Sequence, residues 1–155
     1  MREPATYNGI IEAIANGAAR LNEIATKNNM ESNKCFKYLT SLMALGIVKK
    51  ELLITETMSK KSIYLLDDQM FRFWYRFVFK NMSLIVSEQG EKVYDNFVEP
   101  QLNHYMGLVF EDICRQYLQE KLKDDTAPFF FGDIGRWWGN NAKLKRQEEI
   151  DIMTF

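Results

Sequence analysis

The chain is poor in the residues that build metal and disulfide sites. It has one histidine, His104, two cysteines, Cys35 and Cys114, and no Cys-x-x-Cys pair. A zinc site made of Cys and His side chains needs several such ligands at close spacing, so this class of site is excluded. Both cysteines lie in apolar helical patterns, which predicts two buried free thiols in a reducing cytoplasm.

Three further features are missing, and each absence removes a class of protein. The N-terminus has no apolar run of the kind found in secretory signals. The most apolar stretch, 70–86, contains Arg72, Arg76 and Lys80, which argue against a transmembrane helix. No GxxxxGK[ST] phosphate-binding loop occurs, so ATP binding is not expected. We therefore expect a cytoplasmic protein without a membrane partner.

The composition and the distribution of charge favour two folded parts. The chain is 46% hydrophobic and 14% aromatic, which is enough to build a packed core. Residues 1–66 carry nine Lys/Arg against six Asp/Glu, whereas residues 67–155 carry eleven against fifteen. A mildly basic part followed by an acidic one favours a DNA-binding module joined to a second domain. We place the boundary between 66 and 67.

Three short helices are predicted in the first part, because apolar residues recur there at intervals of three and four. Each ends at a residue type that tolerates a left-handed backbone. The apolar segments and the residues that close them are 10–15 with Gly17, 20–27 with Asn28 and Asn29, and 33–45 with Gly46.

Beyond Gly46 the apolar period shortens to about two, which is typical of strands. The pattern predicts a hairpin of strands 47–54 and 62–66, joined by a polar turn. Three helices followed by a hairpin is the order of a winged helix-turn-helix, and we assign this fold to residues 1–66.

The function of such a fold depends on its later helix, which enters the major groove and presents polar side chains there. Lysine can contact phosphates or guanine, and asparagine can contact adenine. The predicted DNA-binding residues are Asn33, Lys34, Lys37, Tyr38 and Ser41 on the helix, and Lys60 and Lys61 at the tip of the wing. Double-stranded DNA is the predicted partner. The same residues also suit the solvated face of a protein-docking module, and that alternative stays open.

The second part begins at Asp67-Asp68, which suits the start of a helix. The aromatic stretch 70–80 follows, with Arg72, Arg76 and Lys80 spaced by four. We interpret it as a core helix with one solvent-facing basic stripe, in preference to a surface for single-stranded nucleic acid.

Further along, helical spacing covers 93–123, and Pro100 predicts a break or bend there. The later piece has most of its apolar residues on or near one side, with Glu111 among them. Those apolar residues are Tyr105, Leu108, Val109, Ile113, Cys114, Tyr117 and Leu118. Strands are predicted at about 128–138 and 148–155, separated by a turn that starts at Gly139.

Several segments resemble a known family. They are FRFWYRFVFKNMSLI, YMGLVFEDICRQYL, IGRWWG and EEIDIM, preceded by YNGIIEAIANGAARLNEIA. Together they are similar to the winged helix and the C-terminal "domain of unknown function 234" of archaeal-type AAA ATPases, over residues 4–155. The resemblance implies a PD-(D/E)xK nuclease-like fold, with Glu111 on a helix and Asp151 as a metal-binding aspartate on a strand.

The chain departs from that family pattern after Asp151. The expected strand with Glu-x-Lys is missing, because only four residues follow and none is lysine. Metal-dependent nucleases need converging acidic ligands and a lysine, so Glu111 and Asp151 form at most a partial site. We therefore expect a truncated domain, no enzyme activity and no cofactor. A divalent metal would bind only if the site were completed elsewhere.

The sequence thus predicts an α+β, mostly helical chain: a winged helix-turn-helix, a helical region, and the first strands of a nuclease-like α/β domain. The predicted function is a non-catalytic DNA-binding or regulatory module. One alternative is a partial or inactive metal-dependent nuclease. Another is a protein-interaction or dimerisation module, because a two-stranded sheet would leave an open edge and expose Trp137 and Trp138.

Overall fold

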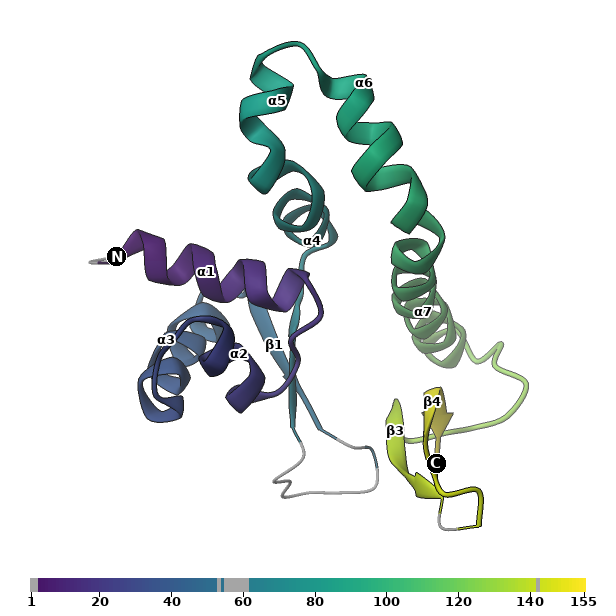
Figure 1. The fold of residues 1–155 in the computed structure, drawn as a ribbon. Coiled ribbons are helices and arrows are strands. Elements are labelled where there is room, and N and C mark those ends of the chain that lie inside the picture. The colour runs from purple at the N-terminus through teal and green to yellow at the C-terminus, as the bar shows by residue number, and fades with distance from the viewer. Residues whose placement is uncertain (1–2, 53, 55–61, 142) are drawn as a thin grey trace. The chain divides into compact units, whose positions relative to one another are not determined.

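The computed structural model describes residues 3–52, 54, 62–141 and 143–155 (Figure 1). These residues form a mostly helical α+β chain with two separate antiparallel hairpins. The chain divides into two compact units, one from residues 1–51 and 62–101 and the other from residues 52–61 and 102–155. Within the described ranges, no helix is both long enough and apolar enough to cross a bilayer.

The first unit opens with the three predicted helices, which the structure confirms. Each is followed by a residue with positive φ: Gly17 at 93°, Asn29 at 50° and Gly46 at 70°. After the first helix, the Ala18 N–H donates to the Ala13 carbonyl at 3.0 Å, a bond typical of a Schellman motif. The helices are α1 (Pro4–Ala15), α2 (Leu21–Lys27) and α3 (Ser32–Ala44).

The predicted hairpin follows α3. Strands β1 (Val48–Glu51) and β2 (Ile63–Leu66) pair antiparallel, with Val48 opposite Leu66. The Tyr64 N–H of β2 donates to the carbonyl of Ala19 at 2.8 Å, which ties the connection between α1 and α2 to the free edge of β2. The predicted turn, with Lys60 and Lys61, lies outside the described residues.

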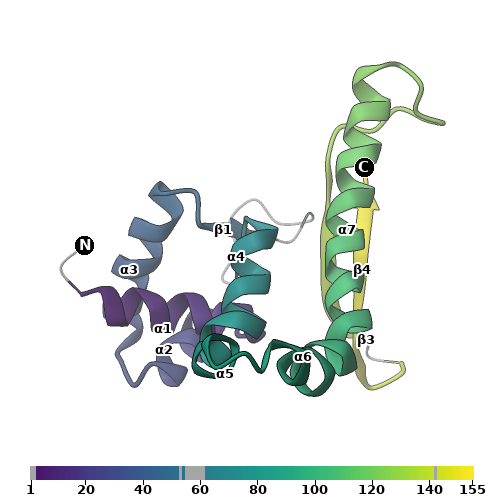
Figure 2. The same cartoon turned by 90° about the horizontal axis from the view of Figure 1, so that it is seen from above.

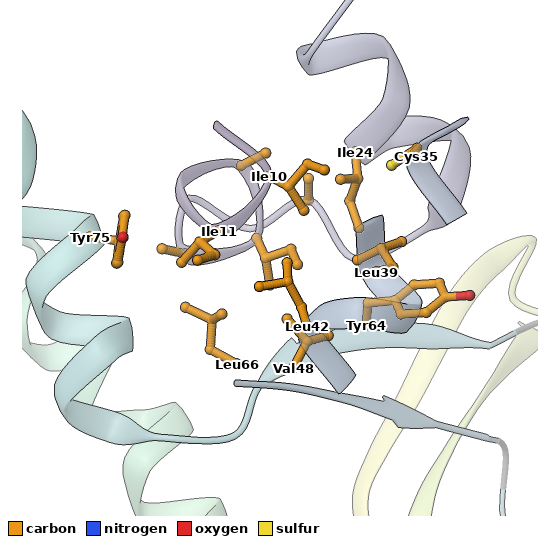
Figure 3. Packing of buried hydrophobic residues seen from close by; sticks show 14 of the residues in the cluster. Ile10, Ile11, Ile24, Cys35, Leu39, Leu42, Val48, Tyr64, Leu66 and Tyr75 are labelled. Carbon is orange, nitrogen blue, oxygen red and sulfur yellow. The ribbon is translucent and has the colours of Figure 1, made fainter. Parts of the chain in front are cut away.

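The core of the first unit lies between these helices and the hairpin (Figure 3). Its fully buried side chains come from all three helices, and Val48, Tyr64 and Leu66 close it on the hairpin side. Cys35 belongs to this core, as predicted, whereas Cys114 is half-buried. The residues with no exposed surface are Ile10, Ile24, Cys35, Leu39 and Leu42.

A helical segment completes the first unit, and the chain turns back between α5 and α6 (Figure 1). Asp68 caps its start, since its carboxylate accepts a hydrogen bond from the Phe71 N–H at 2.9 Å. The pieces are α4 (Gln69–Phe73), a π turn (Trp74–Val78), a 3-10 turn (Phe79–Asn81), α5 (Met82–Val86), α6 (Gly90–Val93) and a second π turn (Tyr94–Val98).

The predicted solvent-facing basic stripe in this segment is wrong. Arg72 is only 8% exposed, and its guanidinium donates to the Leu66 carbonyl at 3.0 Å. Phe71, Phe73 and Trp74 instead expose more than a third of their surface. The π turn inserts an extra residue into the helical register, so side chains before and after it do not share the face that an unbroken α-helix predicts.

The second unit pairs a long helix with a hairpin. Helix α7 (Glu99–Lys123) runs beside strands β3 (Ile134–Asn141) and β4 (Arg146–Thr154) (Figure 2). The predicted break or bend at Pro100 lies beside a change of helix type, because the π turn at Tyr94–Val98 runs directly into α7, whose second residue is Pro100. A proline removes one backbone N–H from the helix, and π turns often occur where the regular hydrogen-bond pattern is interrupted.

The hairpin also corrects the predicted strand bounds. Strand β3 begins at Ile134 rather than near 128, and Phe130, in the irregular segment before it, is 88% exposed. Gly139 lies within β3 rather than in a turn. The turn follows Asn141, whose side-chain oxygen accepts from the N–H groups of Lys143 and Leu144 at 3.0 and 3.1 Å.

The two tryptophans of β3 are not the exposed aromatics that the sequence predicts. Trp138 is only 7% exposed, and Trp137 is half-buried. A register shift between Gly135 and Trp137 changes which side chains β3 turns inward. On the other edge of β3, the Ile54 N–H donates to the Arg136 carbonyl at 3.2 Å.

Candidate functional site

Helix α3 presents a polar face away from the core of the first unit. Its buried residues Cys35, Leu39 and Leu42 fix the rotation of the helix. At about 100° per residue, Asn33 and Lys37 fall on the opposite side and Lys34 on its flank. All three are exposed, as the sequence predicts for side chains that reach a partner.

Tyr38 and Ser41 are half-buried and have hydrogen-bond partners within the unit. The Tyr38 hydroxyl donates to the Glu3 carboxylate, and its ring packs edge-on against Tyr7 with centroids 5.0 Å apart. The Ser41 hydroxyl donates to the Lys37 carbonyl at 3.2 Å. Tyr38 thus contacts residues outside α3, whereas the Ser41 bond is local to the helix, and both stay predicted DNA-binding residues beside Asn33, Lys34 and Lys37.

Glu3 is a neighbour of this face that the sequence reasoning missed. The hydrogen bond from Tyr38 and the nearby charge of Lys34 lower the pKa of Glu3. The same hydrogen bond raises the pKa of the Tyr38 hydroxyl. A carboxylate beside Lys34 offsets part of the positive potential that the two lysines create. Sequence spacing gives no sign of this contact, because Glu3 and Tyr38 are 35 residues apart.

A second polar cluster lies between α7 and the β3–β4 hairpin. Glu111 of α7 forms an ion pair with the Arg136 guanidinium of β3, and their side chains are only 18% and 11% exposed. The Arg136 Nε is also 3.4 Å from a carboxylate oxygen of Glu149 on β4. Asp151, on the same strand, is exposed, and its carbonyl accepts from the Arg115 guanidinium at 3.2 Å.

The electrostatics of this cluster are dominated by burial. Loss of solvent raises the pKa of Glu111, Arg136 opposes that rise, and Asp151 and Glu149 add to it. Asp151 thus belongs to the electrostatic surroundings of Glu111, and the predicted partial metal site stays a prediction. Arg136 is the member that the sequence reasoning missed, although a charged residue inside an apolar strand does indicate a buried partner.

The cluster as it stands suits charge neutralisation better than metal binding. The Glu111 carboxylate is paired with a guanidinium, which a divalent cation would have to displace. Across the described residues, no group of three or more His, Cys, Asp or Glu side chains is placed to hold a metal ion.

Comparison with known proteins identifies relatives of this chain. A profile of archaeal and bacterial proteins of unknown function, DUF234, matches residues 74–155. An uncharacterized protein of Methanocaldococcus jannaschii is 36% identical over 155 residues, which cover 99% of this chain and 33% of that protein. The chain thus spans about a third of the length of that relative. No solved structure matches it significantly. Because the profile match covers more than half of the residues, the chain belongs to the DUF234 family.

Proposed function

We propose that the chain is a non-catalytic DNA-binding module whose first unit contains a winged helix that binds double-stranded DNA. The observation that carries the proposal is the solvent-facing part of α3, where Asn33, Lys34 and Lys37 are all exposed away from the buried residues of the helix. In a helix-turn-helix this is the face that enters the major groove.

The arrangement around that face supports a winged helix. Helices α1 to α3 are followed directly by the β1–β2 hairpin, in the order that defines the fold. The bond from the Tyr64 N–H to the Ala19 carbonyl places the connection between α1 and α2 along β2, as a short third strand would lie. The hairpin lies beside α3, and Lys60 and Lys61, which fall between its two strands in the sequence, are proposed to contact the phosphate backbone.

The chemistry of the face predicts mainly phosphate contacts. Lysine ammonium groups bind phosphate as point charges, and an asparagine amide can pair with adenine. Two lysines and one asparagine, with Glu3 beside them, are a small set of contacts. We therefore expect weak, strongly salt-dependent binding with little sequence preference.

Binding to a fluorescent random-sequence duplex, followed by anisotropy across a salt series, tests the proposal. Lys34→Ala plus Lys37→Ala should weaken binding about tenfold and reduce the log–log salt slope by about two. Lys92→Ala plus Lys123→Ala removes the same charge from exposed helical positions elsewhere, and it should bind like the parent. Absence of binding at low salt, or an equal loss in the control variant, would overturn the proposal.

A metal-dependent nuclease is the second candidate, because Glu111 and Asp151 belong to one cluster on α7 and β4. Its test is cleavage of supercoiled plasmid in Mg²⁺ or Mn²⁺. We expect none, because the carboxylate of Glu111 is paired with Arg136. Metal-dependent cleavage that Glu111→Gln abolishes would replace the non-catalytic proposal.

A further inference from the structure

Helix α7 carries large side chains on two opposite sides, contrary to the single apolar side that the sequence predicts. The side that meets the hairpin holds the buried Tyr105 and the ion-paired Glu111. The opposite side holds four exposed apolar residues, which we term the α7 stripe. They are Met106, Phe110, Ile113 and Tyr117, with 46, 64, 52 and 57% of their surface exposed.

The stripe has the spacing of a helix-packing seam. Its members are separated by four, three and four residues, so at about 100° per residue they fall within an arc of about 60°. Together they expose on the order of 400 Å² of mostly apolar side chain, estimated from the typical areas of large side chains. An apolar patch of this size matches the largest patch on a typical monomeric protein, which is often functional.

We propose that the α7 stripe is a self-association surface and that a second copy of this chain packs on it with its α7 antiparallel. The stripe is symmetric about a point between Glu111 and Asp112. An antiparallel copy therefore sets Met106 against Tyr117 and Phe110 against Ile113, so that every member meets a different side chain of the partner.

The residues that flank the stripe are compatible with this pairing. They are Gly107, Val109, Cys114 and Gln116, which carry no charge, and Lys121, whose ammonium lies 5.6 Å from the Tyr117 ring centroid, would face the uncharged Leu102 of the antiparallel copy. Gly107 also lets the two backbones approach closely. The four stripe residues of two copies would bury about 800 Å², and the flanking residues bring the total near the ~1,000 Å² that a specific interface needs.

This inference goes beyond the proposed function and does not depend on DNA binding by the first unit. Sedimentation velocity over a concentration series should show the 18.3 kDa chain shifting to twice that mass. Phe110→Asp should keep the chain monomeric, whereas Phe130→Asp, which alters an 88%-exposed phenylalanine outside the helix, should leave the dimer intact. Circular dichroism should show unchanged helix content in both variants. A parent chain that stays monomeric at all concentrations would overturn the proposal.

Disulfide trapping tests the antiparallel register. In that register, residue 107 of one copy lies only about 3 Å along the axis from residue 114 of the other, at about 1.5 Å per residue. Oxidised Gly107→Cys should therefore form dimers linked through the native Cys114, and mass spectrometry of the peptides should identify that link. Adding Cys114→Ser should abolish the crosslink. A crosslink that survives this change and that mass spectrometry assigns to the two introduced cysteines would overturn the antiparallel arrangement.

Discussion

Each of the two units of the chain is stabilised internally by a different kind of contact. In the first, side chains from three helices and a hairpin pack into one apolar core, and several of them have no exposed surface. In the described part of the second, fewer apolar residues are buried: Tyr105 on α7, with Phe131 and Trp138. There the ion pair between Glu111 and Arg136 joins the helix to its hairpin.

This difference decides which substitutions each unit can tolerate. A packed apolar core loses stability when volume is removed, because the neighbouring side chains cannot fill the gap. A contact between elements that depends on a partly buried ion pair loses stability when one charge is left without its partner. Removal of volume should therefore act most strongly on the first unit, and removal of a charge on the second.

The largest effect is expected from Leu39→Ala in the centre of the first core. Leu39 has no exposed surface, so its truncation should cost about 2–5 kcal/mol of unfolding free energy. Urea unfolding gives that loss, and amide hydrogen exchange in α1 to α3 should locate it in the first unit. Leu45→Ala removes the same atoms from a residue that is 56% exposed, and its cost should be far smaller. Equal losses in both variants would show that this core is not packed as described.

The second unit should respond most to the loss of Arg136. Arg136→Met leaves the Glu111 carboxylate partly buried near Glu149 and Asp151, and should cost about 2–3 kcal/mol. Glu111→Gln should cost about 1 kcal/mol or less, because it removes the charge that burial disfavours and leaves Arg136 beside Glu149. Urea unfolding of both variants checks the asymmetry. If Glu111→Gln instead lost more unfolding free energy than Arg136→Met, the charge of Glu111 would contribute more to stability than its burial costs.

The pH dependence of stability gives an independent check on Glu111. Its pKa in the folded chain is raised above the ordinary value of 4.5, so the folded state holds the proton more tightly than the unfolded state does. This contribution to stability is complete below pH 4.5 and is lost as pH rises through the raised pKa. Glu111→Gln should remove that loss. If the unfolding free energy of the variant still fell above pH 4.5 as steeply as that of the parent, another group would be responsible.

The first unit was predictable from sequence because its signals are local. Gly17, Asn29 and Gly46 end the helices where their backbone preferences indicate. The change of apolar period after Gly46 then places the hairpin correctly. Helical spacing also predicted that Asn33, Lys34 and Lys37 of α3 face away from the core. It did not predict the contact between Tyr38 and Glu3, because this contact joins residues that are far apart in the chain.

The second unit was less predictable because its features depend on tertiary contacts. The register shift between Gly135 and Trp137 changes which side chains face inward, and periodicity does not reveal such a shift. Arg136 therefore escaped notice, and Trp138 was wrongly predicted to be exposed. Apolar spacing alone also cannot separate a helix with one apolar side from α7, whose apolar residues lie on two opposite sides.

A smaller effect is expected where the helical segment meets α1 in the first unit. The Tyr75 hydroxyl donates to the Asn8 side-chain oxygen at 2.9 Å, and Tyr75 is only 8% exposed. Tyr75→Phe should cost about 1 kcal/mol, because it leaves the Asn8 oxygen without this donor. Urea unfolding measures the loss. Tyr94→Phe, at a residue that is 47% exposed, is the matched control and should change nothing measurable.

The smallest expected change is electrostatic and falls on the α3 face. Tyr38→Phe removes the hydrogen bond that is the main cause of the lowered pKa of Glu3, so that pKa should rise toward 4.5. Lys34→Ala removes the second cause and should raise it less. Carboxyl ¹³C shifts followed by NMR across acid pH report both changes. Glu3 contributes stability above pH 4.5 that is lost as pH falls through its lowered pKa, opposite in sign to Glu111. If Tyr38→Phe left the pKa of Glu3 unchanged, Tyr38 would not be the residue that holds this carboxylate beside Lys34.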